Sequence, residues 1–193
     1  MKSIQSVLTV AVLWLLTACG PSSAGKETIL KAEGGDASAQ TIVGGWHYKG
    51  NERLGIYQDY AKGLEWFRKA AEQGEPYALR MIALSYERGD GVSRDYAQAA
   101  YWFRKAAEQD DAYGQYWLGN AYAEGPGGII YKGFNEPQDL VLAYAWLNVA
   151  SNGYYEDAEK SRDRLESSLT PAQLAEAQRL SSGWRKGQSI QRE

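Results

Sequence analysis

The residue types that most often carry catalytic or metal chemistry are nearly absent from this sequence. Its 193 residues contain one histidine, His47, and one cysteine, Cys19. A usual zinc site needs several Cys or His ligands. A serine–histidine–aspartate triad would have to use His47, and the sequence holds no G-x-S-x-G motif. We therefore predict that the protein is not an enzyme, that it binds no metal and no cofactor, and that His47 has a packing role.

Binding of phosphate or nucleic acid is poorly supported as well. The glycine-rich stretch at residues 125–128 could suggest a phosphate loop, but it follows a predicted helix, whereas such a loop must follow a strand. The chain carries 21 basic and 24 acidic residues, a net charge of -3, and it has no basic cluster. Because nucleic-acid binding requires a basic surface, the composition predicts no nucleic-acid partner.

The first residues have the features of a bacterial export signal. Lys2 supplies a positive charge, and residues 7–16 form a short apolar run. Because a helix that spans a bilayer needs about 20 apolar residues, this run is too short to be a membrane span. The run ends in Leu-Thr-Ala-Cys at residues 16–19. This ending resembles the bacterial lipobox, a Leu-small-small-Cys motif.

The lipobox resemblance implies that residues 1–18 are a signal peptide and that Cys19 becomes a lipidated N-terminus. An ordinary secretory signal that happens to hold a cysteine is the alternative. In such lipoproteins a residue other than Asp after the cysteine favours the outer membrane, so Gly20 implies an anchor there, facing the periplasm. Residues 19–35 are mostly small and polar, and we predict a flexible tether.

The rest of the chain is organised by a repeat. The string Trp-Phe-Arg-Lys-Ala-Ala-Glu-Gln at residues 66–73 returns letter for letter at residues 102–109, and a looser copy begins at Trp146. Self-similarity at a fixed period is the signature of stacked repeat units. Aligning the copies divides the chain into three units, residues 36–74, 75–110 and 111–153.

Each unit is predicted to contain two helices. A glycine ends the first helix, because glycine adopts the left-handed conformation most easily, and an aspartate caps the second. Small residues flank the repeated tryptophan at three- and four-residue spacing, so we expect that tryptophan to be buried between helices. The glycines are Gly50, Gly89 and Gly125, the aspartates are Asp59, Asp95 and Asp139, and the tryptophans are Trp66, Trp102 and Trp146.

This pattern resembles the Sel-one-like repeat family, which is related to tetratricopeptide repeats. The resemblance implies an all-α fold over residues 36–184, a right-handed α/α solenoid of three two-helix repeats. Helices in residues 154–184 would cap it, and residues 185–193 would form a loose tail. His47 replaces a core tyrosine of the other units. The matching positions of the middle unit are Ala78, Ile82, Ala83, Tyr86, Gly89, Gly91, Val92, Asp95, Ala99, Trp102, Ala106 and Ala107.

One row of positions on the first helix of each unit is not used by the predicted core. Its members are three or four residues apart, so they share one helix face, and stacking would align the rows into a concave groove. Tyr and Arg are frequent anchors of protein interfaces, so the rows predict a groove that binds another protein. A solvated face is the alternative. The predicted contacts are Tyr48, Tyr77, Arg80, Tyr113, Tyr116 and Asn120.

The third unit has a longer loop that combines glycines with apolar residues. Two interpretations of this loop remain open. It could contact a partner, or it could fold back over the last helices. The residues concerned are Ile129, Ile130, Tyr131 and Phe134.

Together these features predict a non-catalytic, monomeric, lipid-anchored scaffold for protein–protein interaction in the bacterial cell envelope. Some Sel-one-like lipoproteins resemble immunity proteins that neutralise a secreted effector such as a lipase, and this resemblance implies the same narrower function here. The alternative is an enzyme or glycan-binding protein that acts on peptidoglycan, because aromatic side chains can stack on sugars.

Overall fold

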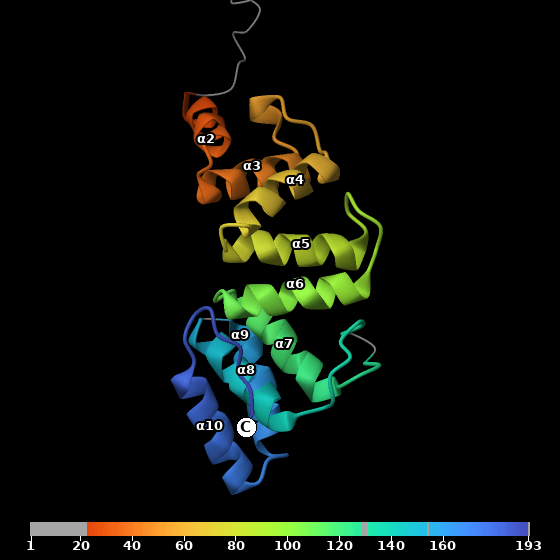
Figure 1. Cartoon of the computed structure of the whole chain (residues 1–193), viewed down its shortest axis with the longest axis vertical. Helices are drawn as coiled ribbons and strands as arrows, with labels where there is room; N and C mark the ends of the chain where they lie inside the picture. Colours follow the sequence, from red (N-terminus) through yellow and green to blue (C-terminus); the bar gives the residue numbers. More distant parts are fainter. Residues whose placement is uncertain (1–22, 129–130, 154, 193) are drawn as a thin grey trace, which may run out of the picture.

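The computed structural model describes residues 23–128, 131–153 and 155–192. Over these residues its regular elements are α-helices and one 3-10 helix. They form an α/α solenoid, as the repeat predicts (Figure 1). In chain order the elements are α2 (Ser23–Glu33), α3 (Ala37–Lys49), η1 (Glu52–Leu54), α4 (Tyr60–Ala71), α5 (Pro76–Arg88), α6 (Tyr96–Glu108), α7 (Ala112–Glu124), α8 (Leu140–Asn152), α9 (Glu156–Glu166) and α10 (Pro171–Gly183).

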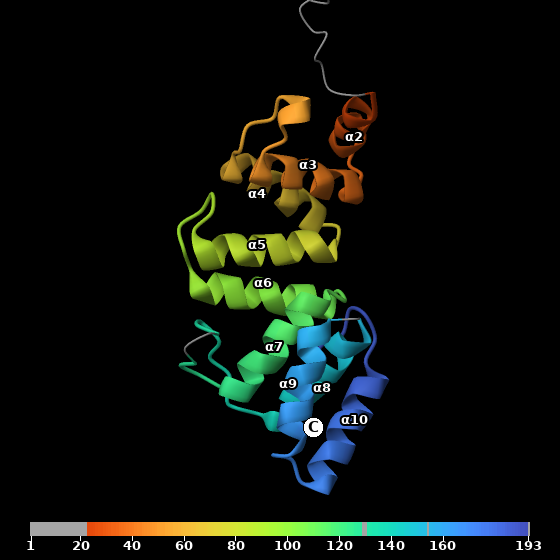
Figure 2. The ribbon, with the colours of Figure 1, turned by 180° about the vertical axis from the view of Figure 1, so that it is seen from behind.

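The three predicted units are the hairpins α3–α4, α5–α6 and α7–α8, stacked along the long axis of the molecule (Figures 1 and 2). The second helix of each hairpin begins at the predicted aspartate, whose carboxylate accepts a backbone N–H of the first turn. The first helices end at Gly50, Gly89 and Gly125, and all three have a positive φ. The capping residues therefore define the helix boundaries that were expected.

The deepest position differs from the expected one in the first two hairpins. We expected the repeated tryptophan to be sealed between helices, but Trp66 and Trp102 are only half-buried. In the third hairpin Trp146 is fully buried, as expected. The residue that follows each tryptophan is fully buried in all three hairpins: Phe67, Phe103 and Leu147 have no exposed surface.

Small residues on the first helix make room for this buried side chain. A Cβ added at Gly44 of α3 would lie 2.8 Å from the Phe67 ring, and one at Gly119 of α7 would lie 2.7 Å from Leu147 Cγ. In the middle hairpin the equivalent residue is Ala83, which belongs to the same buried cluster as Phe103. The small residue therefore accommodates the side chain after the tryptophan, which moves the centre of the core by one position along the second helix.

The segment expected to be a tether contains helix α2 instead, which packs on α3. Its Ala32 is buried with Ala39 and Val43, and Ile29 packs against the same cluster. The segment looked like a linker because glycines flank it and most of its residues are polar. Ile29 and Ala32, three residues apart, nevertheless give the helix an apolar side.

Helix α2 lies on α3 as the second helix of one repeat lies on the first helix of the next. At the junction of α2 with α3, Gln40 Nε2 donates a hydrogen bond of 3.2 Å to the Ala32 carbonyl. At the junction of α6 with α7, Gln115 Nε2 donates a hydrogen bond of the same length to the Ala107 carbonyl. Because these hydrogen bonds occupy equivalent places, α2 takes the position of a second repeat helix and covers the first hairpin.

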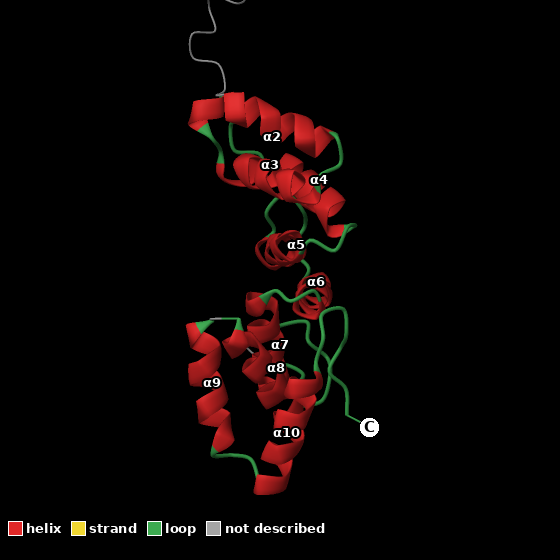
Figure 3. Cartoon of the chain, turned by 90° about the vertical axis from the view of Figure 1, so that its left-hand side faces the viewer, coloured by secondary structure: helices red, strands yellow, loops and turns green. Residues whose placement is uncertain are grey.

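The end of the chain closes the other end of the solenoid. Helices α9 and α10 pack on α8, in the place expected of capping helices (Figure 3). The Thr170 side chain accepts a hydrogen bond from the Gln173 N–H, and Gln173 bonds back to Thr170, which completes the predicted capping box.

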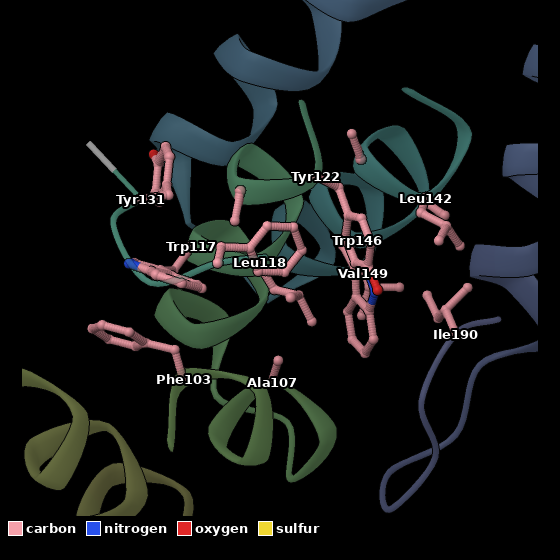
Figure 4. Close-up of a cluster of buried hydrophobic side chains, with 14 of the residues drawn as sticks. Phe103, Ala107, Trp117, Leu118, Tyr122, Tyr131, Leu142, Trp146, Val149 and Ile190 are labelled. Carbon is pink, nitrogen blue, oxygen red and sulfur yellow. The ribbon is translucent and has the colours of Figure 1, made fainter. Parts of the chain in front are cut away.

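The last residues were expected to be loose, but residues 184–192 pack against the solenoid. Ile190 is only 5% exposed and belongs to the largest buried cluster, near Leu142 and Val149 (Figure 4). The Gly187 N–H donates a hydrogen bond of 2.6 Å to the Glu108 carbonyl at the end of α6. Because Ile190 supplies a buried apolar side chain, this segment is held against α8 and α10 and helps to bury Trp146.

The buried position after the tryptophan leads to a stability prediction. Phe103→Ala should lower the free energy of unfolding by about 3–5 kcal/mol, because it deletes a fully buried ring. Trp102→Ala should lower the free energy of unfolding by a smaller amount, because the Trp102 side chain is only half-buried. Urea denaturation followed by circular dichroism measures both changes. A cost for Trp102→Ala equal to or above that for Phe103→Ala would contradict this account of the core.

Candidate functional site

His47 and the acidic side chains are the first residues to consider for a chemical site in the described part of the chain. Within that part, no group of three or more His, Cys, Asp or Glu could hold a metal ion. His47 is half-buried near the end of α3, and burial, assisted by the charge of Lys62, lowers its pKa. Its backbone carbonyl accepts a hydrogen bond of 2.7 Å from the Asp59 N–H. These contacts place His47 at the junction of α3 with α4.

Two adjoining hollows lie along the first helices of the repeats. They share Tyr77, so they form one continuous face over α3, α5 and the start of α7. The hollow over α5 has a volume of about 220 Å³, and the hollow beside α3 has a volume of about 420 Å³. The first is lined by Tyr77, Arg80, Met81, Leu84, Arg88 and Tyr113, and the second by Ser38, Thr41, Ile42, Gly45, Glu75 and Tyr77. We call this surface the α3–α5–α7 face.

Arg80 is the central residue of this face. Its guanidinium lies 4.7 Å from the centroid of the Tyr77 ring and 5.7 Å from that of Tyr113, so it contacts one tyrosine from each of two repeats. Its Nε atom is 3.5 Å from a carboxylate oxygen of Asp111. An arginine held by an ion pair and two rings loses little side-chain freedom when a partner binds, which favours affinity.

Asp111 connects this surface to the backbone of the next repeat. It caps α7 by accepting a hydrogen bond of 2.8 Å from the Gly114 N–H. Burial raises the pKa of its carboxyl, and the nearby Arg80 charge opposes that rise. A buried carboxylate that loses its cation is costly. The position of Arg80 on α5 is therefore set by the carboxylate of Asp111 at the start of α7.

A cluster of tyrosines continues the face beyond Arg80. The ring centroids of Tyr113 and Tyr155 are 5.8 Å apart, and those of Tyr116 and Tyr155 are 4.9 Å apart. Burial raises the pKa of Tyr113 and of Tyr155, so both hydroxyls are neutral at neutral pH. The sequence reasoning missed Tyr155, because it lies beyond the third repeat unit. The predicted Asn120 donates its side-chain amide to the Tyr116 carbonyl of its own helix at 2.9 Å.

Tyr48 was expected on this face, but it belongs to the core. Its side chain is 7% exposed, packs edge-on against Tyr60 at 4.8 Å, and donates a hydrogen bond to Asp90. Burial, together with the Asp90 carboxylate, raises the pKa of Tyr48 to about 12. The reason lies in Gly63 of α4. A Cβ at Gly63 would be 3.1 Å from the Tyr48 nitrogen, so glycine lets the two helices approach more closely than a larger residue would.

The loop of the third unit folds back, at least at the residues that the structure describes. Tyr131 and Phe134 are buried, and their ring centroids lie 5.4 Å and 6.2 Å from Trp117 of α7 (Figure 4). They therefore line the core of the last repeat and are not free to contact a partner. Ile129 and Ile130, the other two residues of this prediction, lie outside the described residues.

An ion pair and a hydrogen bond, both to Glu136, hold this loop in place. Arg104 of α6 forms an ion pair with Glu136, and the Tyr122 hydroxyl donates to the same carboxylate at 2.7 Å. The loop thus bridges the second and third repeats. Of the two interpretations of this loop, Tyr131 and Phe134 follow the one in which it folds back, although they pack against α7 and not over the last helices.

The comparison with known families gives one clear match. The model of the Sel1 repeat family matches three stretches of the chain, residues 37–75, 76–111 and 112–154. Each stretch contains one of the three hairpins, and its boundaries differ by one residue from those of the predicted repeat unit.

Individual proteins and structures agree with the family match. The chain is 36% identical over 61 residues to HRD3A, an ERAD-associated E3 ubiquitin-protein ligase component of Arabidopsis thaliana. This match covers 32% of the present chain but only 9% of HRD3A. It resembles c5321, a protective antigen of uropathogenic Escherichia coli strains with an SLR fold (29% identity, TM-score 0.55, 82% of this chain and 39% of the other). It also resembles a Sel1 repeat protein from Oxalobacter formigenes, with 29% identity and a TM-score of 0.61. That match covers 72% of the present chain and 96% of the other.

The placement of the tyrosines gives a test of which residues are structural. Tyr48→Ala should lower the free energy of unfolding by about 3 kcal/mol or more, because it removes a buried ring. Tyr77→Ala should cost about 1 kcal/mol or less, because its ring is partly exposed and mainly contacts Arg80. Urea denaturation of the two variants provides the comparison. Equal costs would show that this division between core and surface is wrong.

Proposed function

Because this chain belongs to the Sel1 repeat family, we propose that it is a lipid-anchored scaffold that binds another protein on its α3–α5–α7 face. Sel1 repeats generally mediate protein–protein interaction without catalysis. The observation that carries the proposal is Arg80, which is fixed between Tyr77 and Tyr113 beside a hollow. Arginine and tyrosine are the side chains most often found at the energetic centres of protein interfaces.

The surroundings of Arg80 indicate what kind of segment would fit. The floor of the hollow over α5 is apolar, with Met81 and Leu84, and Arg88 lies exposed at its edge. Ile42, which is 47% exposed, extends the apolar surface toward α3. A partner segment that inserts an apolar side chain and places an acidic group near Arg88 would complement this surface in both shape and charge.

The lipid anchor is part of the proposal and rests on the sequence around Cys19. The only cysteine of the chain stands at the end of a short apolar run, in a Leu-Thr-Ala-Cys context. Several acyl chains on one residue give stable membrane attachment, unlike a single chain. With Gly20 after the cysteine, we place the protein in the outer membrane, facing the periplasm. Among the described residues no helix is long and apolar enough to cross a membrane.

A narrower form of the proposal is that the protein neutralises a secreted effector of the lipase type. It is motivated by the combination of a lipobox with a Sel1 repeat solenoid, which resembles immunity lipoproteins. A face with preset anchors suits such a function, because a binder that needs no rearrangement associates tightly.

The immunity hypothesis makes a simple prediction about cells. A strain that lacks the gene should be killed by contact with sibling cells that still produce the effector, and expression of the intact chain should restore survival. Counting viable cells in mixed cultures measures the effect. Survival of the deletion strain at the level of its siblings would rule out this narrower function and leave the scaffold proposal standing.

The binding face can be tested with a double variant of two exposed residues and a control variant on another helix. The purified protein is used to capture partners from a cell-envelope extract, and the dissociation constant of each captured protein is then measured. The double variant Tyr77→Ala, Arg88→Ala should weaken binding by about tenfold or more, because it removes two exposed anchors.

The control for this experiment is Tyr101→Ala. Tyr101 is 51% exposed on α6, outside the α3–α5–α7 face, so its removal should leave binding unchanged. Unchanged thermal stability of both variants confirms that the effect is local. A captured protein that binds the double variant as tightly as the original chain would contradict the proposed face.

A further inference from the structure

The described part of the chain begins very close to the proposed anchor. Helix α2 starts at Ser23, only four residues after Cys19. Even a fully extended chain covers at most about 3.6 Å per residue, so this distance is below about 14 Å. The headgroup layer on one side of a bilayer is about 5–8 Å thick. A lipid on Cys19 would therefore hold the start of α2 within or just above the headgroups.

Helix α2 also forms one end of the molecule. It lies across the top of the solenoid, over α3, and α9 and α10 lie toward the opposite end (Figures 1 and 3). The turn that contains η1 reaches the same end, and Leu54 of this turn contacts Gly25 of α2 so closely that a side chain there would collide with it. Thus α2 and the η1 turn together form the terminal surface next to the proposed anchor.

The outward side of α2 has the chemistry of a surface that contacts lipid headgroups. Gly25 and Ala32 are buried, Ile29 packs toward α3, and Leu30 on the outer side is 66% exposed. Lys26 is exposed, and Lys31 pairs with Glu27 at 2.8 Å. Glu33 is exposed as well, so Leu30 lies among two lysines and two glutamates. Such a mixture suits the headgroup boundary, where the apolar side chain enters and the charged groups stay among the zwitterionic headgroups.

A second copy of the chain would be a less suitable occupant of this end. Repeat units stack through apolar faces, and terminal units carry a polar outer face to prevent further stacking. The outward side of α2 carries Lys26, Glu27 and Lys31, so stacking on another solenoid would desolvate several charges.

We infer that the solenoid rests on the membrane through α2, with Leu30 at the headgroup boundary. The inference depends on the lipid anchor of the proposed function and adds which surface faces the membrane. In this orientation α2 contacts lipid, and the α3–α5–α7 face extends from the first repeat away from the bilayer. The anchor then presents the binding face to the aqueous compartment in a defined direction.

The test uses the full lipidated protein, purified from membranes and reconstituted into vesicles of phosphatidylethanolamine and phosphatidylglycerol. A new cysteine replaces Leu30 and carries an environment-sensitive fluorophore. The matched control carries the label at Ser168, an exposed residue between α9 and α10 at the far end of the solenoid. The label at residue 30 should shift its emission to shorter wavelength and lose intensity when brominated lipids are added, and the label at residue 168 should do neither.

A longer connection provides the second variant. Twenty glycine and serine residues inserted after Gly20 leave the fold and the lipidation motif intact, so the blue shift at residue 30 should decrease. Equal responses at residues 30 and 168 in acylated protein would overturn the orientation alone. A response at residue 30 that grows with protein density on the vesicle would assign this end to a second copy and would also overturn it. If the measured mass of the intact protein showed no acyl chains on Cys19, the anchor and the orientation would be overturned together.

Discussion

The structure depends on the inability of a single helical hairpin to bury its own apolar side. Each hairpin places Phe67, Phe103 or Leu147 at full burial, against a small residue of the first helix. The hairpin still needs a neighbour to cover the rest of its apolar surface, so the repeats stack, and the two ends of the stack require separate solutions. Helix α2 provides one of them, and α9, α10 and residues 184–192 provide the other.

The same stacking creates the candidate binding face. Arg80 belongs to the second repeat and Asp111 to the third, and the ion pair between them exists only when the two repeats are packed. Tyr113, over which the guanidinium lies, is also contributed by the third repeat. The face is therefore a property of the assembled solenoid, and no isolated unit carries it. The residues that form it are an arginine, an aspartate and tyrosines, so the face uses neither the histidine nor the cysteine of the chain.

The repeat architecture could be predicted well from the sequence because the residues that begin and end each helix act locally. The aspartate caps and the glycines with positive φ act within one helical turn, and both define boundaries that the structure reproduces. The tryptophan expectation was partly wrong because periodicity fixes a face only to within about one residue on a helix of 3.6 residues per turn. Trp66 therefore lies at the edge of the face whose centre is Phe67.

The remaining errors concern contacts between residues that are distant in the chain. Tyr48 is buried because Gly63 lets two helices approach, and Ile190 is buried because Leu142 and Val149 of α8 offer an apolar surface there. Helix α2 was missed for a similar reason, since Ala32 and Ile29 become informative only when α3 is there to receive them. Arg80 and Tyr113 were predicted as surface anchors, whereas their mutual contact could not be read from spacing alone.

The terminal segment changes how the solenoid should come apart. Stacked repeats usually behave as a line of neighbours, each able to open from its own end. Here the hydrogen bond from Gly187 to Glu108 fastens the last residues of the chain to the second repeat, across the third. The two later repeats and the terminal segment also share the largest buried cluster, whereas α2 packs with α3 in a small cluster around Ala32, Ala39 and Val43. A further cluster joins α4 to α5. Opening would then begin at α2, so its amide hydrogens should exchange faster than those of the later repeats.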